Sequence, residues 1–253
     1  MLTGYFDEAC GKDFTVVCGW IASVDEWDNF EVDWKLFLIK YDVPYFHMKE
    51  FVHCLGPYEK WKEGPEIRKR FLIDAWDIIS SRVRRGFVCG IQQVLFNRVN
   101  RTYHLEETFP SCYALVGREA MDWANRYAKE MREEVKCMFE DGGPEKGGLL
   151  KAADVAPMVS TPDFEPSRDI QDRKKGTRKG VIQIQAADFL AYEVRKFYID
   201  HPLYRNGQRV PRMSMRQFGK KKPDTKLMSE ERITNTCKRY SVEQRSENDR
   251  NKT

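Results

Sequence analysis

The sequence contains no long hydrophobic run. A helix that crosses a membrane needs about 18 or more consecutive apolar residues, and no such stretch occurs in this chain. The N-terminus also lacks a basic segment followed by an apolar stretch, which is the pattern of a secretory signal. We therefore expect a cytoplasmic protein that has no contact with a membrane.

Closely spaced cysteine pairs are also absent. The chain has seven cysteines, an odd number, and no Cys-x-x-Cys motif. This pattern argues against a structural zinc site and against a disulfide framework. We interpret the cysteines as mostly buried thiols in a reducing compartment. They are Cys10, Cys18, Cys54, Cys89, Cys112, Cys137 and Cys237.

No internal repeat and no clear linker divides the chain. The 253 residues suit one large domain, with or without elaborations. We assign residues 1–200 to this domain. Residues 201–253 are interpreted as a basic C-terminal extension, which we expect to be partly disordered because it is polar and has few residues that form a core.

Positive charge is concentrated towards the C-terminus. The formal net charge is +4, but residues 168–253 carry 22 Lys/Arg and 11 Asp/Glu, which leaves residues 1–167 with a net charge of −7. An acidic body joined to a basic segment is the arrangement expected of a metal site beside a track for nucleic acid. The same composition is also typical of a solvated tail.

Predicted strands alternate with predicted helices along the chain. Strand patterns cover residues 2–7, 12–23, 85–96 and 134–141, and helical spacing covers residues 24–41, 65–83 and 109–130. Residues 181–198 begin as a short strand-like piece and continue as a helix. In the first of these helices, five apolar side chains share one face: Trp27, Phe30, Trp34, Phe37 and Leu38. Residues 142–180 read as irregular. This order predicts an α/β fold with a mixed central sheet and helices on both faces.

Carboxylates recur where predicted strands end. Pairs of acids end two of the strands: Asp7 with Glu8, and Glu140 with Asp141. Asp188 lies near the start of the last helix, three residues after Gln185, so both can point from one helix face. Its neighbours in the chain are apolar, and aspartate is a poor helix former. Each acid taken alone could equally be a turn former or a helix cap.

Acids at strand ends predict a metal site if the fold gathers them. Sites in open α/β sheets form at the carboxyl ends of strands. Converging carboxylates repel one another unless a divalent cation lies among them. Hard oxygen ligands suit Mg²⁺ or Mn²⁺, and such a cluster can hold two ions about 3.5–4 Å apart that act on a phosphodiester.

Two further groups of residues carry possible chemistry. His47 and Glu50 are three residues apart, a spacing that could bind a metal, position water or transfer protons, and that also suits a pair at the start of a helix. The basic run before the Asp188 helix could hold a polyanion, or could be a solvated loop. The candidate nucleic-acid ligands in this run are Lys174, Lys175, Arg178 and Lys179.

Three motifs resemble those of a known family. "GYFDEAC" is similar to the Tyr-x-Asp-Glu-Ser-Gly signature of the family called domain of unknown function 3800, with Ala9-Cys10 in place of Ser-Gly. "YFHMKEF" resembles its Phe-His motif, and "QIQAADFLAYEVRK" resembles its Gln-x-Ala-Asp-x-x-Ala-Tyr motif. "FED" at residues 139–141 falls where the family has its strand-ending Asp. The resemblance covers residues 2–198.

This resemblance implies a ribonuclease H-like fold. In that superfold a central mixed sheet carries acidic residues on its first and fourth strands and on a late helix. The implied metal ligands are Asp7, Asp141 and Asp188, with Glu8, His47, Glu50 and Gln185 in or beside the site. Glu140 competes with Asp141, because neighbouring residues of a strand face opposite sides and the register is open.

Three hypotheses about function follow. The first is a metal-dependent phosphodiesterase, with Mg²⁺ or Mn²⁺, that acts on DNA or RNA and uses His47 or Glu50 for proton transfer. The second is a non-catalytic protein of the same fold that binds nucleic acid or a partner. The third is a hydrolase of small substrates, such as a glycosidase with two carboxylates, which three clustered acids suit less well.

Overall fold

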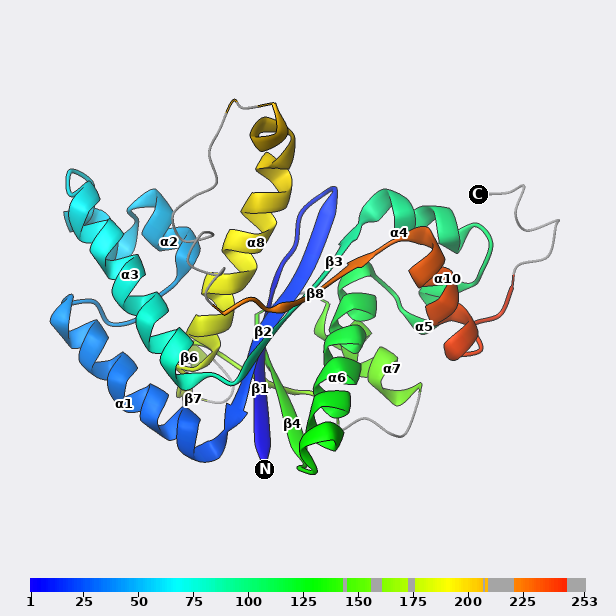
Figure 1. The fold of residues 1–253 in the computed structure, drawn as a ribbon, viewed down its shortest axis with the longest axis horizontal. Helices are drawn as coiled ribbons and strands as arrows, with labels where there is room; N and C mark the ends of the chain where they lie inside the picture. Colours follow the sequence, from blue (N-terminus) through cyan, green and yellow to red (C-terminus); the bar gives the residue numbers. More distant parts are fainter. Residues whose placement is uncertain (143–144, 156–160, 173–175, 207, 209–220, 245–253) are drawn as a thin grey trace.

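A mixed sheet forms the centre of the molecule (Figure 1). The computed structural model describes residues 1–142, 145–155, 161–172, 176–206, 208 and 221–244. The six strands of the sheet lie in the order β5-β4-β1-β2-β3-β8. They are β1 (Leu2–Ala9), β2 (Phe14–Ser23), β3 (Arg85–Gln92), β4 (Val135–Glu140), β5 (Asp163–Glu165) and β8 (Asp224–Met228).

The strands of this sheet run in both directions. β1 pairs with β2, and β2 with β3, in antiparallel register. β1 with β4, β4 with β5, and β3 with β8 are parallel pairs. A short turn suffices for an antiparallel neighbour, whereas a parallel neighbour needs a long crossover, here built largely from helices. The predicted α/β fold with a mixed sheet is confirmed.

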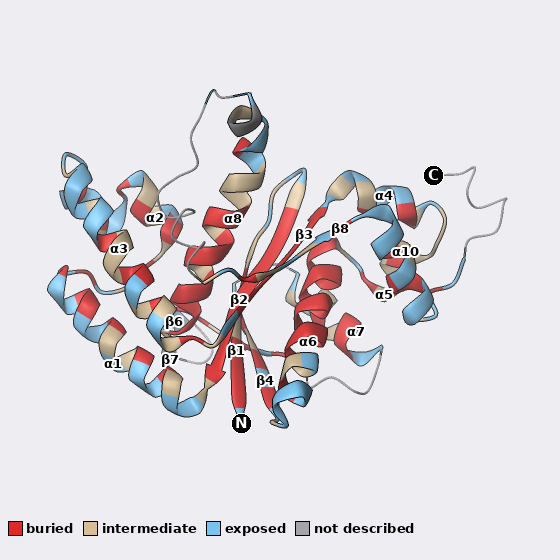
Figure 2. Ribbon diagram, viewed as in Figure 1, coloured by how far each residue is buried: buried red, intermediate tan, exposed pale blue. Residues whose placement is uncertain are grey.

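Helices cover both faces of the sheet. One face carries α1 (Val24–Lys40), α2 (Met48–His53), a 3₁₀ helix η1 (Gly56–Trp61), α3 (Pro65–Arg82) and α8 (Ile184–Arg205). The other face carries α4 (Gln93–Asn100), α5 (Leu105–Thr108), α6 (Cys112–Met131), α7 (Lys146–Asp154) and α10 (Glu230–Arg239). Buried residues follow the sheet and the helix faces turned to it (Figure 2).

The core on the α8 face is rich in aromatic rings. The five apolar residues predicted to share one face of α1 are all buried. Trp34 of α1 stacks on Phe30 and contacts Phe46 of the loop before α2. Ser23 starts α1 as a capping box with Glu26, which satisfies backbone N–H groups at the helix start. This packing holds α1 and the loop before α2 against α8.

Two predicted boundaries differ from the structure. The strand predicted over residues 85–96 ends at Gln92, because α4 begins there and places Phe96 and Val99, three residues apart, in the core. Residues 142–180 also contain regular elements: α7, β5, and a hairpin of β6 (Ile170–Asp172) with β7 (Gly176–Arg178). These elements are short, so periodicity gives little signal for them.

Part of the predicted extension, residues 201–253, belongs to the domain. α8 continues to Arg205, β8 adds a strand to the sheet beside β3, and α10 follows it. Met228, Ile233 and Cys237 are buried in the core on the α6 face. The structure therefore does not divide at residue 200, because the chain returns to the sheet after that point.

We find no helix in the described part of the chain with the length and apolar character needed to cross a membrane.

Candidate functional site

Asp7 and Glu140 reach the same face of the sheet. β1 and β4 run parallel with Phe6 opposite Phe139, and both rings lie in the core on the α6 face. Because successive side chains of a strand alternate, the next residues, Asp7 and Glu140, point to the other face, where α8 packs on β1. α8 carries Asp188. The three acids thus come from two neighbouring strands and one helix.

Electrostatic coupling shows that these acids lie close together. Burial raises the pKa of Asp7 well above its ordinary value, and the charges of Glu140, Glu8 and Asp188 raise it further. Burial also raises the pKa of Glu8 to about 7 and that of Asp188 to about 6, and Glu140 contributes to both. We call Asp7, Glu8, Glu140 and Asp188 the acid cluster. The charge of each ionised member disfavours ionisation of its neighbours.

Few hydrogen bonds offset this charge. Asp188 Oδ2 accepts from Met48 N at 2.6 Å, at the start of α2. Glu140 Oε1 accepts from Ser167 Oγ at 2.7 Å, yet burial still leaves the pKa of Glu140 raised. Among the described residues, Glu8 Oε2 is buried without a hydrogen-bond partner. A buried carboxylate in that condition needs a cation or a proton.

Asp141 lies outside the acid cluster. Its carboxylate pairs with Arg178 Nη1 at 2.5 Å and with Lys146 Nζ at 3.2 Å. Burial acts to raise the pKa of Asp141, but the hydrogen bonds from Arg178 and Lys146 outweigh it and lower the pKa. The sequence leaves Glu140 and Asp141 as alternatives and favours Asp141. The register of β4 turns Glu140, and not Asp141, towards Asp7 and Asp188.

His47 and Glu50 lie beside the acid cluster and contact each other. His47 Nδ1 is 3.2 Å from Glu50 Oε1, and the charge of His47 acts to lower the pKa of Asp188. Burial alone would raise the pKa of Glu50, but hydrogen bonds from Tyr45 and Arg168 lower it. Those bonds measure 2.7 Å and 2.9 Å. Glu50 is therefore held ionised.

Gln185 is a buried anchor. Its Oε1 accepts from Trp34 Nε1 and from Phe46 N, both at 2.9 Å, and its Nε2 donates to Ser167 O at 2.8 Å. The sequence predicts Gln185 in or beside the site. Its three polar contacts are to α1, to the loop before α2 and to the segment that carries Ser167, so it positions the parts around the acid cluster.

Two of the four predicted basic ligands fall in the described part of the chain. Lys174 and Lys175 lie outside the described residues. Arg178 pairs with Asp141 and with Glu165 Oε2, the latter at 3.1 Å. Lys179 is exposed and lies 2.6 Å from Asp169 Oδ2. The predicted basic run therefore contributes Lys179 to the surface, while Arg178 holds the end of β4 to β7.

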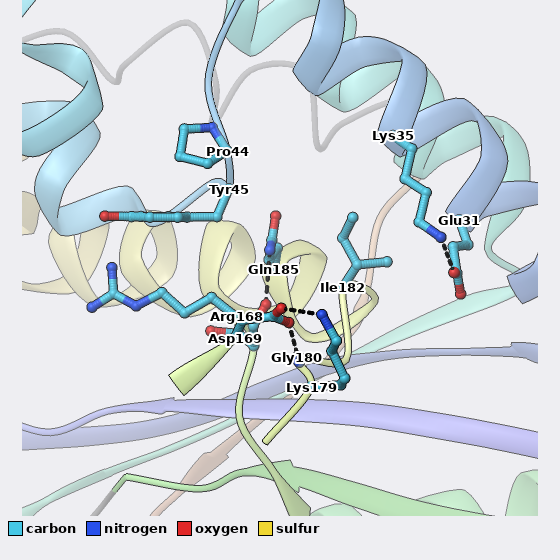
Figure 3. Close-up of a pocket in the computed structure, with 11 residues that line it drawn as sticks. Glu31, Lys35, Pro44, Tyr45, Arg168, Asp169, Lys179, Gly180, Ile182 and Gln185 are labelled. Carbon is cyan, nitrogen blue, oxygen red and sulfur yellow. Dashed lines mark hydrogen bonds and ion pairs between the residues drawn. The ribbon is translucent and has the colours of Figure 1, made fainter. Parts of the chain in front are cut away.

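A pocket of about 710 Å³ adjoins the acid cluster (Figure 3). It is lined by Glu31, Lys35, Pro44, Tyr45, Ser167, Arg168, Asp169, Lys179, Gly180, Ile182 and Gln185. Ser167 lines the pocket and also donates to Glu140, and Arg168 lines it and pairs with Glu50. We call it the Arg168 pocket. Sequence reasoning did not select Tyr45 or Arg168, because their contact joins segments that are far apart in the chain.

The chemistry of the acid cluster suits a hard divalent cation. Its donors are carboxylate oxygens, which Mg²⁺ and Mn²⁺ prefer, and Glu8 Oε2 has no donor of its own in the described structure. Within the described ranges, however, no three His, Cys, Asp or Glu side chains are arranged so that they could hold a metal ion. The acids raise one another's pKa, but their side chains are farther apart than the ligands of one metal ion would be.

The chain matches no protein-family model, and no curated protein matches it.

Proposed function

We propose that the protein is a phosphodiesterase that depends on a divalent metal, Mg²⁺ or Mn²⁺, and acts on DNA or RNA. The observation that carries this proposal is the acid cluster: buried carboxylates on β1, β4 and α8 that raise one another's pKa. The proposed ligands are Asp7, Glu140 and Asp188, with Glu8 beside them. Asp141, which the sequence favours over Glu140, is bound to two cations.

The distribution of acids supports a ribonuclease H-like assignment. That superfold carries its acids on the first and fourth strands and on a late helix. Asp7 is on β1, Glu140 ends β4 and Asp188 is on α8. The motif resemblance to the domain of unknown function 3800 family points in the same direction. Fold similarity alone does not determine function, so the proposal depends on the chemistry of the acids.

The residues around the acid cluster have separable roles in this proposal. Asp7, Glu140 and Asp188 would hold a divalent cation, which would supply activation of water and stabilisation of the leaving oxygen of a phosphodiester. His47 is the better proton-transfer group of the predicted pair, because the lowered pKa of Glu50 makes that carboxylate a weak base. His47 Nδ1 lies 3.2 Å from Glu50 Oε1 without forming a hydrogen bond to it. The imidazole therefore keeps nitrogen atoms that can exchange a proton.

A cleavage assay tests the proposal. Labelled DNA and RNA strands are incubated with the protein and with Mg²⁺ or Mn²⁺. We expect cleavage that EDTA abolishes and that Asp188→Asn reduces by about 100-fold or more, equivalent to about 2.7 kcal/mol of transition-state stabilisation. Asp154→Asn, an exposed residue at the end of α7, is the matched control. Full activity of Asp188→Asn would refute the role of the acid cluster.

The same assay addresses a second candidate function. A protein that binds nucleic acid without cleaving it fits the finding that no three potential ligands in the described ranges are spaced for a metal ion. That function predicts salt-dependent binding of nucleic acid by the wild-type protein. It also predicts no turnover with either metal.

A further inference from the structure

The Arg168 pocket combines cationic groups with a flat stacking surface. Figure 3 shows Tyr45 and Arg168 towards one end of the pocket and the Lys35–Glu31 pair towards the other. The guanidinium of Arg168 lies over the Tyr45 ring, 4.5 Å from its centroid. Stacked aromatic and guanidinium planes are surfaces on which unpaired nucleobases stack. Pro44 and Ile182 add apolar wall.

Two of the cations in this pocket are available to an anion. Lys35 Nζ pairs with Glu31 at 2.5 Å, and Lys179 Nζ pairs with Asp169 at 2.6 Å. The two lysine side chains are 59% and 83% exposed. Ion pairs that are this exposed contribute about 0–1 kcal/mol, so a phosphate can compete with the Glu31 and Asp169 carboxylates for the two ammonium groups.

One short segment connects the pocket to the acid cluster. Ser167 donates to Glu140, the next residue Arg168 pairs with Glu50, and the following residue, Asp169, pairs with Lys179. Ser167 therefore contacts the acid cluster and lines the pocket at the same time. A ligand that is a chain of phosphates could occupy both places at once.

The size of the pocket selects among nucleic acids. About 710 Å³ is within the range of small-ligand sites and accommodates a nucleotide unit, but not a base pair with its two backbones. From these features, and resting on the proposed action on nucleic acid, we infer that the Arg168 pocket binds one unpaired nucleotide of a single strand. The base stacks at the Tyr45–Arg168 end, and the phosphate binds Lys35 and Lys179.

Binding without cleavage tests this inference. Fluorescence anisotropy in EDTA measures the affinity for a labelled single strand and for the same strand in a duplex. We expect tighter binding of the single strand. The double variant Lys35→Glu/Lys179→Glu should weaken that binding about tenfold or more. Because one phosphate loses its neutralising lysines, the slope of log K against log salt should also become shallower by about 0.7.

A variant with the same charge change serves as the control. Lys129→Glu/Lys151→Glu alters exposed lysines of α6 and α7, on the other face of the sheet, and should retain wild-type affinity. Circular dichroism of both double variants verifies folding. Equal affinity for single strand and duplex overturns the inference, as does a Lys35/Lys179 variant that binds like the control.

The inference and the proposed function can fail separately. A wild-type protein that binds single strands through the pocket but cleaves nothing refutes the phosphodiesterase and keeps the inference. A wild-type protein that cleaves, with unchanged binding in the Lys35/Lys179 variant, keeps the phosphodiesterase and refutes the inference. Absence of any nucleic-acid binding in EDTA overturns the inference.

Discussion

Gln185 on α8 accepts a buried hydrogen bond from Trp34 on α1, with 2.9 Å between Gln185 Oε1 and Trp34 Nε1. The bond fixes the rotation of α8 relative to α1. Asp188 lies three residues further along α8, on the same helix face, and meets the acids of β1 and β4 there. The position of Asp188 in the candidate site therefore depends on a hydrogen bond between two uncharged side chains, Gln185 and Trp34.

Replacing Gln185 should destabilise the protein. Gln185→Leu leaves three buried groups unpaired: Trp34 Nε1, Phe46 N and Ser167 O. Each unsatisfied buried group costs about 1–3 kcal/mol, so we expect the free energy of unfolding to fall by about 3–5 kcal/mol in urea titrations. Gln93→Ala, which removes one exposed bond to Asn97, should change it by about 0.5 kcal/mol or less. Equal stabilities of the two variants would contradict the anchoring role.

The acid cluster should make stability fall as pH rises through 6 and 7. Burial raises the pKa of Glu8 from 4.5 to about 7 and that of Asp188 from 3.8 to about 6. Between those limits the folded protein holds protons that the unfolded chain has lost, so the stabilisation is complete below the ordinary pKa values and is lost as pH rises through the folded ones. Unfolding in urea across this range measures it.

Matched variants isolate this pH dependence. Glu8→Gln should reduce the loss of unfolding free energy as pH rises. Glu66→Gln, a change at an exposed residue at the start of α3, should leave that loss unchanged. Above pH 7, where Glu8 and Asp188 are largely ionised, Mg²⁺ or Mn²⁺ should raise the melting temperature, and at pH 5 it should have a smaller effect because protons compete with the metal. A stability that rises between pH 5 and 7, with no effect of Glu8→Gln, would disprove the coupling.

Glu140 and Asp141 should differ in their effect on metal binding. Glu140→Gln removes a member of the acid cluster, and calorimetric titration with Mn²⁺ should show affinity reduced by about 10–100-fold or more. Asp141→Asn breaks the pairs with Arg178 and Lys146 but leaves the cluster charge intact, so its Mn²⁺ affinity should stay within about threefold of wild type. A threefold change in affinity corresponds to about 0.7 kcal/mol of binding free energy. The reverse ranking would return Asp141 to the ligand set.

Glu119 should hold the C-terminal elements to the domain. Its side chain is fully buried on α6 and pairs with Lys226 of β8 and Arg239 of α10. Breaking a buried ion pair costs about 3–5 kcal/mol. We expect Glu119→Ala to cost about 2–3 kcal/mol, because Lys226 and Arg239 are partly exposed. Urea unfolding measures this, with exposed Glu130→Ala on the same helix as the control; equal values would show that these pairs contribute nothing.

Long, strongly patterned elements could be predicted from the sequence. The stripe of apolar residues on α1 recurs every three or four positions, and all five predicted members are buried. The mixed α/β architecture follows from such elements in order. β8 and α10 were not predicted because β8 is polar in three of its five residues and α10 buries only Ile233, Thr236 and Cys237. These residues are buried by contacts with β3 and the core on the α6 face, which the spacing of apolar residues along the chain does not reveal.

The candidate site was predictable in composition but not in register. Asp7, Glu8 and Asp188 are visible in the sequence as acids in apolar surroundings. The choice between Glu140 and Asp141 depends on which side of β4 faces α8, and that is decided by Phe139 packing on Phe6, a stacked pair with centroids 5.1 Å apart. The Arg168–Tyr45 contact depends on tertiary structure alone.

The last strand of the sheet lies beside β3, although the whole chain from α4 to α8 separates them. While the chain emerges from the ribosome, the outer backbone edge of β3 stays open until Met228 has been synthesised. An open edge of this kind pairs readily with strands of other molecules. A chain truncated before Asp224 would therefore leave this edge of β3 unpaired, and we expect such a product to aggregate.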